Sequence, residues 1–161
     1  MSFSEKQKEI LRFPYRDEYD ALICDGAVRS GKTSIMSLSF VLWMMAGFNH
    51  CSFAFCGKSV GAVERNIIQP LLSVRYLQQQ FQLTYNRSGH VLTVRRGDKE
   101  NRIYLFGGKD ESSYMLIQGI TLAGVLLDEV ALMPRSFVEQ ALARCSVTGA
   151  KYWFNCNPEN P

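Results

Sequence analysis

The chain has 161 residues, 47% of them hydrophobic and 20% charged, with a formal net charge of +3 at pH 7, which predicts one globular domain and excludes a disordered or fibrous protein. Its most apolar stretch, residues 40–48, is much shorter than the roughly 18 residues of a membrane span. The N-terminus lacks the apolar run of a signal peptide, so we expect a cytoplasmic protein with no membrane partner.

Strands alternate with helices along the first half of the chain. Residues 21–24 form a short apolar run before a glycine-containing loop, and residues 31–46 follow without proline and with apolar residues at helical spacing. Residues 52–56 predict a second strand, and residues 59–80 predict a helix that Pro70 is expected to kink or divide. This order of elements is typical of an α/β fold with a mainly parallel sheet.

At the start of the second half of the chain, the spacing of the apolar residues changes from helical to strand-like. Residues 81–108 carry apolar residues at strand spacing, interrupted by turn sequences at 86–89 and 97–98, and predict a β-hairpin insertion. A short helix is expected at 110–116, a buried parallel strand at 123–127, a helix at 137–144 and a last strand at 151–155. The whole chain, residues 1–161, is predicted to be one domain.

A phosphate-binding loop lies between the first predicted strand and the helix that follows it. The run Gly26-Ala27-Val28-Arg29-Ser30-Gly31-Lys32-Thr33 fits GxxxxGK[ST] without a mismatch. Its backbone N–H groups and the start of the helix predict an anion site. Lys32 is expected to reach the β- and γ-phosphates, and the Thr33 hydroxyl to bind Mg²⁺. Arg29 is either an arginine finger in cis or a surface residue.

Two carboxylates follow the buried strand at 123–127. Asp128 and Glu129 come at the carboxyl end of a parallel strand, the edge where ligands bind in open α/β sheets. Downstream of a phosphate loop, this is a Walker B pattern. We expect Asp128 to hold Mg²⁺ and Glu129 to orient and deprotonate the attacking water. The pair favours hydrolysis of the nucleotide.

Several features indicate which kind of P-loop NTPase this is. A guanine-reading NKxD motif is absent, which favours ATP over GTP. The strand between the phosphate-loop helix and Asp128 is typical of the additional-strand, catalytic-glutamate, RecA-like class. In that class a polar residue after the strand beside Walker B senses the γ-phosphate, and either Asn155 or Asn157 is a candidate, unless Asn157 only begins a turn. Gln7, 19 residues before Gly26, is either an adenine reader or a solvated helix residue.

A basic segment accompanies the predicted hairpin. Between residues 87 and 109 the chain has six basic residues (Arg87, Arg95, Arg96, Lys99, Arg102, Lys109) and two acidic ones (Asp98, Glu100). Such a segment can contact the phosphates of double-stranded DNA. A solvated hairpin face explains it equally well, because base-stacking aromatic residues are not interleaved with the charges.

Three stretches together resemble the large terminase subunit of tailed bacteriophages, especially its PBSX-type branch. They are the phosphate loop at 26–33, the run Gln118-Gly119-Ile120-Thr121-Leu122-Ala123-Gly124-Val125-Leu126-Leu127-Asp128-Glu129, and the C-terminal run Asn155-Cys156-Asn157-Pro158-Glu159-Asn160-Pro161. Many ATPases share the loop and the acid pair, whereas Gly-Ile-Thr-Leu-Ala-Gly and Asn-Pro-Glu-Asn-Pro are more specific. The likeness spans almost the whole chain.

The resemblance implies a packaging motor. In that family, a homo-oligomeric ring of large subunits docks on the portal protein, works with a small terminase subunit and uses ATP to drive double-stranded DNA into a procapsid. Gln7 would then read adenine, and Asn155 or Asn157 would lie in the coupling motif. Complete members also carry a C-terminal nuclease domain. The resemblance therefore implies that residues 1–161 are the N-terminal ATPase part of a longer protein, without nuclease activity.

Two other functions fit the same motifs. A DNA helicase or remodelling translocase would use the same ATPase core, although strand separation requires a second RecA-like domain. An ATP-dependent assembly module would use the nucleotide as a binding switch and not as a fuel. The effect of removing the Glu129 carboxylate on phosphate release separates a motor from a switch.

Overall fold

A computed structural model describes residues 2–25 and 31–156 of the chain. Residues 26–30 of the phosphate loop and residues 157–161 fall outside the described residues, and so do Arg29 and Asn157, which the sequence analysis singled out. A seven-stranded sheet has the order β1-β7-β6-β2-β5-β4-β3. Its strands are β1 (Ala21–Asp25), β2 (Ser52–Gly57), β3 (Gln82–Asn86), β4 (Val91–Arg96), β5 (Lys99–Gly107), β6 (Gly124–Asp128) and β7 (Lys151–Cys156).

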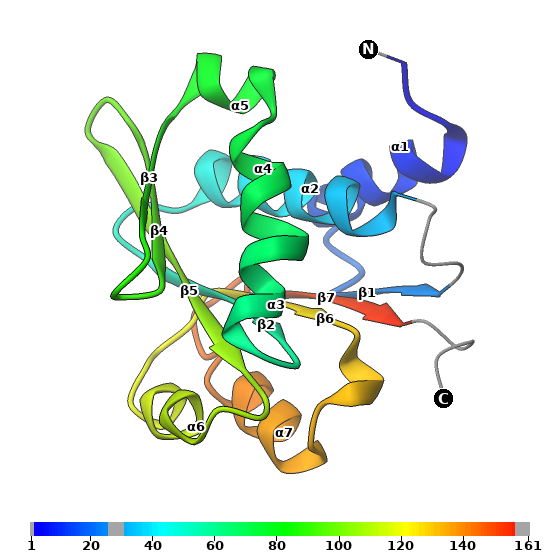
Figure 1. The fold of residues 1–161 in the computed structure, drawn as a ribbon. Coiled ribbons are helices and arrows are strands. Elements are labelled where there is room, and N and C mark those ends of the chain that lie inside the picture. The colour runs from blue at the N-terminus through cyan, green and yellow to red at the C-terminus, as the bar shows by residue number, and fades with distance from the viewer. Residues whose placement is uncertain (1, 26–30, 157–161) are drawn as a thin grey trace.

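Helices cover both faces of this sheet (Figure 1). On one face lie α1 (Glu5–Arg12), η1 (Phe13–Tyr15), α2 (Lys32–Gly47), α3 (Val60–Val63), η2 (Glu64–Ile68), α4 (Gln69–Leu72) and α5 (Arg75–Gln80). On the other lie α6 (Glu111–Gln118) and α7 (Arg135–Ala143), with the short η3 (Val130–Leu132) after β6. Among the described residues, no helix has both the length and the apolar character needed to cross a membrane.

The helix α2 is the centre of the larger core. Ten of its residues are buried, so it is apolar on nearly all sides, as expected for a helix enclosed by other elements. Phe40 packs on Trp153 of β7 with ring centroids 4.8 Å apart, and on Phe55 of β2 at 5.1 Å. These aromatic contacts hold the middle of α2 against the sheet.

The predicted α/β fold with a mainly parallel sheet is confirmed. The strands β1, β7, β6, β2 and β5 run parallel, and β3 and β4 form the predicted antiparallel hairpin. One strand differs from the expectation. β5 pairs in parallel with β2, from Ser52↔Arg102 to Gly57↔Gly107, and is therefore a strand of the central sheet and not part of an insertion. Its second half is apolar on both faces, which suits a covered strand.

The helix predicted at residues 59–80 runs without a gap through α3, η2 and α4 and is interrupted before α5, so Pro70 does not divide it. The turn before Pro70 is the π-helical η2, in which the Gln69 N–H bonds Glu64 O, five residues back. Pro70 then continues the helix in α4, and the break comes at Val74, whose backbone is extended. A π-helical turn next to a proline accommodates its missing N–H without a sharp bend.

Candidate active site

The carboxyl ends of three neighbouring strands bring the predicted site residues together. β7 lies between β1 and β6 in the sheet, so Asn155 pairs with Cys24 on one side and with Asp128 on the other. The helix α2 begins at Lys32, close to the same edge. The strand inserted between the phosphate-loop strand and the Walker B strand is thus the last one in the chain, and it places Asn155 between them.

Asn155, Asp128 and Thr33 form one hydrogen-bond network. Asn155 Nδ2 donates to Asp128 Oδ1 at 2.6 Å and to Thr33 Oγ1 at 3.0 Å, and the Thr33 hydroxyl lies 3.4 Å from Asp128 Oδ1. Asp128 is only 6% exposed and Asn155 only 7%. Asn155 Oδ1 is buried and has no hydrogen-bond donor among the described residues. The structure therefore brings a hydroxyl, a carboxylate and a side-chain amide together at one point.

Lys32 lies at the first turn of α2, beside this network. The helix is preceded by Gly31, whose φ of 73° is in the left-handed region that glycine adopts readily. Lys32 Nζ donates to the carbonyl oxygen of Cys156, at the end of β7, at 2.8 Å. Lys32 thus lies at the same sheet edge as Asp128 and Asn155. The N-terminal end of α2 adds a further partial positive charge at this edge.

A cavity of about 340 Å³, here called the phosphate cleft, connects these residues with Glu129. The first turn of α2, the η2–α4 segment and the ends of β6 and β7 line it, through Gly31, Lys32, Thr33, Ser34, Arg65, Asn66, Pro70, Asp128, Glu129 and Asn155. Glu129 has a φ of 53°, which is uncommon for a residue with a side chain and is often kept at functional sites. Both Walker B carboxylates therefore share one space with Lys32 and Thr33.

Sequence reasoning missed Arg65, Asn66 and Pro70 as part of this cleft. Arg65 and Asn66 are exposed polar residues on a helix, and such residues carry no sequence signal that distinguishes a cleft from open solvent. Only the packing of η2 against the core assigns them to the cleft.

Gln7 lies in a neighbouring cavity of about 490 Å³, here called the N-terminal cavity, which Lys32 also lines. α1, the end of β1 and the start of α2 form its walls. In this structure the Gln7 side chain accepts a hydrogen bond from Ser4 N, and Gln7 N donates to Ser4 Oγ, which together form a capping box at the start of α1. The phosphate cleft and the N-terminal cavity share Lys32. A nucleotide site requires such an arrangement, with one part for the nucleotide base and an adjoining part for the phosphates. The role of Gln7 stays a prediction.

Two thiols stand beside Lys32. Burial raises the pKa of Cys24, and the charge of Lys32 partly opposes that shift. Burial also raises the pKa of Cys156, with a further contribution from Asp25. Both thiols therefore stay protonated near neutral pH and act as small apolar groups at the end of β1 and β7.

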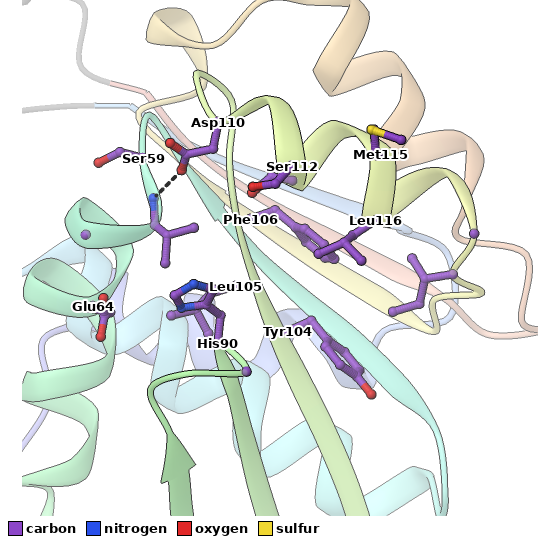
Figure 2. Close-up of a pocket in the computed structure, with 16 residues that line it drawn as sticks. Ser59, Glu64, His90, Tyr104, Leu105, Phe106, Asp110, Ser112, Met115 and Leu116 are labelled. Carbon is purple, nitrogen blue, oxygen red and sulfur yellow. Dashed lines mark hydrogen bonds between the residues drawn. The ribbon is translucent and has the colours of Figure 1, made fainter.

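A larger cavity lies elsewhere and contains none of the predicted site residues. It measures about 810 Å³ and lies between α3, the β3–β4 turn, β5 and α6 (Figure 2). In Figure 2, Glu64 and His90 approach it from one side and Met115 and Leu116 of α6 stand on the other. We call it the α6 cavity. It shares only the α3–η2 helix with the phosphate cleft, because Glu64 lines one cavity and Arg65 the other.

The basic segment at residues 87–109 is partly neutralised by nearby acids. Arg95 and Arg102 both pair with Glu100, at 2.5 and 3.7 Å, and Arg87 pairs with Glu64 at 3.3 Å. The hydrogen bond from Arg95 lowers the pKa of Glu100, so that this acid is charged at neutral pH. A role of the segment in DNA contacts stays a prediction.

Comparisons with known proteins show a close likeness to phage proteins. The large terminase of a thermophilic bacteriophage is 52% identical over 98% of this chain, with a TM-score of 0.92, and this chain covers 40% of it. The same protein in complex with ATP-gamma-S matches with 48% identity, a TM-score of 0.86 and coverage of 98% and 38%. The chain thus spans well under half the length of this relative.

A more distant structure shows the same fold. The large terminase ATPase domain of Thermus phage P74-26 is 17% identical over 98% of this chain and 70% of that domain, with a TM-score of 0.69. No family model and no curated protein matches the chain.

Proposed function

The chain belongs with the ATPase domains of bacteriophage large terminases, and we propose on this premise that it is the ATP-hydrolysing part of a motor that packages double-stranded DNA. The observation that carries the proposal is the phosphate cleft. There Lys32, Thr33, Asp128, Glu129 and Asn155 line one space, as hydrolysis of a metal-bound triphosphate requires. The ATP-gamma-S complex of the thermophilic phage terminase supports the binding of a nucleoside triphosphate by this chain.

In the proposed mode of binding, ATP extends across both cavities. The adenine lies in the N-terminal cavity near Gln7, and the phosphates follow the loop Gly26-Ala27-Val28-Arg29-Ser30-Gly31 to the start of α2. Lys32 leaves the Cys156 carbonyl and reaches the β- and γ-phosphates, because a charged phosphate oxygen is a stronger acceptor than a peptide carbonyl. Arg29, in the same loop, would come within reach of the γ-phosphate.

The residues present fit a magnesium ion. Mg²⁺ prefers hard oxygen ligands, and Thr33 Oγ1 and Asp128 Oδ1 lie 3.4 Å apart in a nearly buried position. Asn155 Nδ2 donates a hydrogen bond to each of these oxygens. Thr33 and Asp128 would hold the ion, which would supply charge neutralisation to the phosphates. Asn155 would orient the two ligands from behind.

Glu129 is the proposed general base. It follows Asp128 directly and lines the cleft, and its left-handed backbone turns the chain away from the strand at this residue. A carboxylate placed there can orient a water molecule toward the γ-phosphate and accept its proton.

The role of Asn155 predicts a specific dependence on magnesium. Asn155→Ala should lower turnover on the order of 10–100-fold, the usual cost of losing a group that orients metal ligands. The Mg²⁺ concentration needed for half-maximal phosphate release should rise at the same time. Asn101→Ala removes another buried amide, one that bonds Cys51 N and Phe48 O away from the cleft. That control should lower stability and leave the Mg²⁺ dependence unchanged, and equal Mg²⁺ curves for both variants would argue against the assignment.

The partners of the whole protein form a further part of the proposal. We expect the large subunit to act in a homo-oligomeric ring on the portal protein, with a small terminase subunit and double-stranded DNA, in the cytoplasm of the bacterial host. The likeness to phage large terminases supports this assembly. Residues 1–161 would be its ATPase part.

Phosphate release with and without duplex DNA tests the proposed motor. The protein alone should turn over slowly, because neighbouring subunits and DNA complete such sites, and duplex DNA should raise the rate several-fold. The stimulation should fall as salt is added, since phosphate contacts release counterions. Fast turnover that ignores DNA, or ATP binding without any phosphate release, would contradict a motor and favour a remodelling enzyme or a binding switch, respectively.

A further inference from the structure

Arg65 adds a second cation to the phosphate cleft. It lies in the π-helical turn η2 and lines the same cavity as Lys32, Asp128 and Glu129. Neither the phosphate-loop motif nor the Walker B motif includes it. Turns of this kind recur at functional sites because they turn side chains out of the regular helical order.

The direction of the helix sends the Arg65 side chain toward the carboxyl edge of the sheet. Side chains on a helix lean toward its N-terminus, and α3 begins just after the carboxyl end of β2, at the ligand-binding edge of the sheet. Consistent with this, a Cβ atom added to Gly61, one turn earlier, would lie 3.2 Å from Arg65 Nη1. The guanidinium group therefore lies near the edge of the sheet.

The start of this helix is held firmly in place. Ser59 Oγ accepts a hydrogen bond from Ala62 N at 3.1 Å, and Asp110 Oδ2 accepts one from Val60 N at 3.1 Å (Figure 2). A side chain at Gly107 would come within 2.6 Å of the Ser59 Cα and Val60 N atoms, so β5 approaches the helix as closely as the backbone allows. The wall that carries Arg65 is thus rigid at its base.

Packing on the far side of η2 fixes which residues face the cleft. The adjacent Ile67 and Ile68 are both buried in the core at 1% exposure, while Arg65 and Asn66 remain exposed and line the cleft. Among the described residues, no carboxylate lies within ion-pair distance of Arg65. Its neighbour Glu64 instead pairs with Arg87.

We infer that Arg65 is a catalytic residue that donates hydrogen bonds from the same subunit to the γ-phosphate as negative charge develops there. The inference rests on the proposed ATPase function and adds a residue to it. The planar guanidinium matches two phosphate oxygens at once, which a lysine does not do. Because ADP lacks the γ-phosphate, Arg65 should distinguish triphosphate from diphosphate, whereas Lys32 should contribute to the binding of both.

The test compares Arg65→Ala, Arg65→Lys and the control Arg75→Ala in the full-length protein. Arg75 is an exposed arginine on α5, outside the phosphate cleft. Arg65→Ala should lower turnover on the order of 10²–10³-fold, the usual cost of losing a donor to developing charge. It should also weaken ATP-gamma-S binding at least about tenfold and leave ADP binding within about twofold. Arg65→Lys should recover only part of the loss, and Arg75→Ala should match the unaltered protein.

Two outcomes would overturn the inference. One is turnover of Arg65→Ala within about twofold of the unaltered protein, and the other is an equal loss of ADP and ATP-gamma-S affinity, which would indicate a structural role. Failure of the proposed function is a separate result, because the unaltered protein would then release no phosphate. Even in that case the ratio of ATP-gamma-S to ADP affinity decides whether Arg65 contacts the γ-phosphate.

Discussion

Glu129→Ala is expected to leave ATP bound and to lower turnover by about 10³-fold, within the range that a positioned general base contributes. The carboxylate lines the phosphate cleft but is not one of the groups expected to hold the phosphates or the metal, so the affinity for ATP should change by less than about threefold. Single-turnover phosphate release and equilibrium binding of ATP would measure the two effects separately.

The backbone at Glu129 calls for two companion variants. Its φ of 53° is unfavourable for alanine and favourable for glycine, so Glu129→Gly removes the carboxylate without backbone strain, and Glu129→Gln keeps the shape of the side chain. All three should bind ATP and fail to hydrolyse it. Glu139→Ala, which removes an exposed acid paired with Arg135, should be fully active. Normal hydrolysis by the Glu129 variants would reject the assignment of the base.

Lys32→Ala is expected to differ from Glu129→Ala, because it should lose the binding of ATP and not only its hydrolysis. Removing a charged group that contacts two phosphates costs roughly 3 kcal/mol or more, which corresponds to at least about a 100-fold rise in the Kd for ATP. In the structure Lys32 Nζ bonds Cys156 O, a contact at the edge of the fold whose loss should lower stability by about 1 kcal/mol.

Titration with ATP and with ADP, together with thermal unfolding, would check the Lys32 prediction. Lys8→Ala serves as the control, since Lys8 forms an exposed pair with Glu5 on α1 and such pairs contribute little. Unchanged ATP affinity in a folded Lys32→Ala protein would show that the cleft does not bind phosphates through this residue.

The sequence predicted the structure correctly wherever a local sequence pattern is compatible with only one local structure. Buried parallel strands such as β6 are continuous apolar runs, and the phosphate loop and the acid pair each occupy consecutive residues. The order of strands could not be predicted, because the pairing of β7 with both β1 and β6 is a long-range contact that no local pattern records. β5 begins with polar residues at hairpin spacing, which conceals its place in the central sheet.

In the candidate site, too, residues in local motifs could be predicted from the sequence, and residues placed by long-range packing could not. Thr33, Asp128 and Glu129 were found from motifs, and the structure brings them together with Asn155, although their roles remain predictions. Arg65 could not be found, because its position in the cleft depends on the π-helical turn η2 and on how Ile67 and Ile68 pack below it. Local propensity does not predict such a turn.

The η2 turn also acts as a partition between two chambers. Arg65 borders the phosphate cleft, and the very next residue along the backbone, Glu64, borders the α6 cavity. A packed interior changes between discrete arrangements and does not deform smoothly. Because adjacent residues of one turn border both chambers, a substitution that shifts η2 would reshape the walls of both.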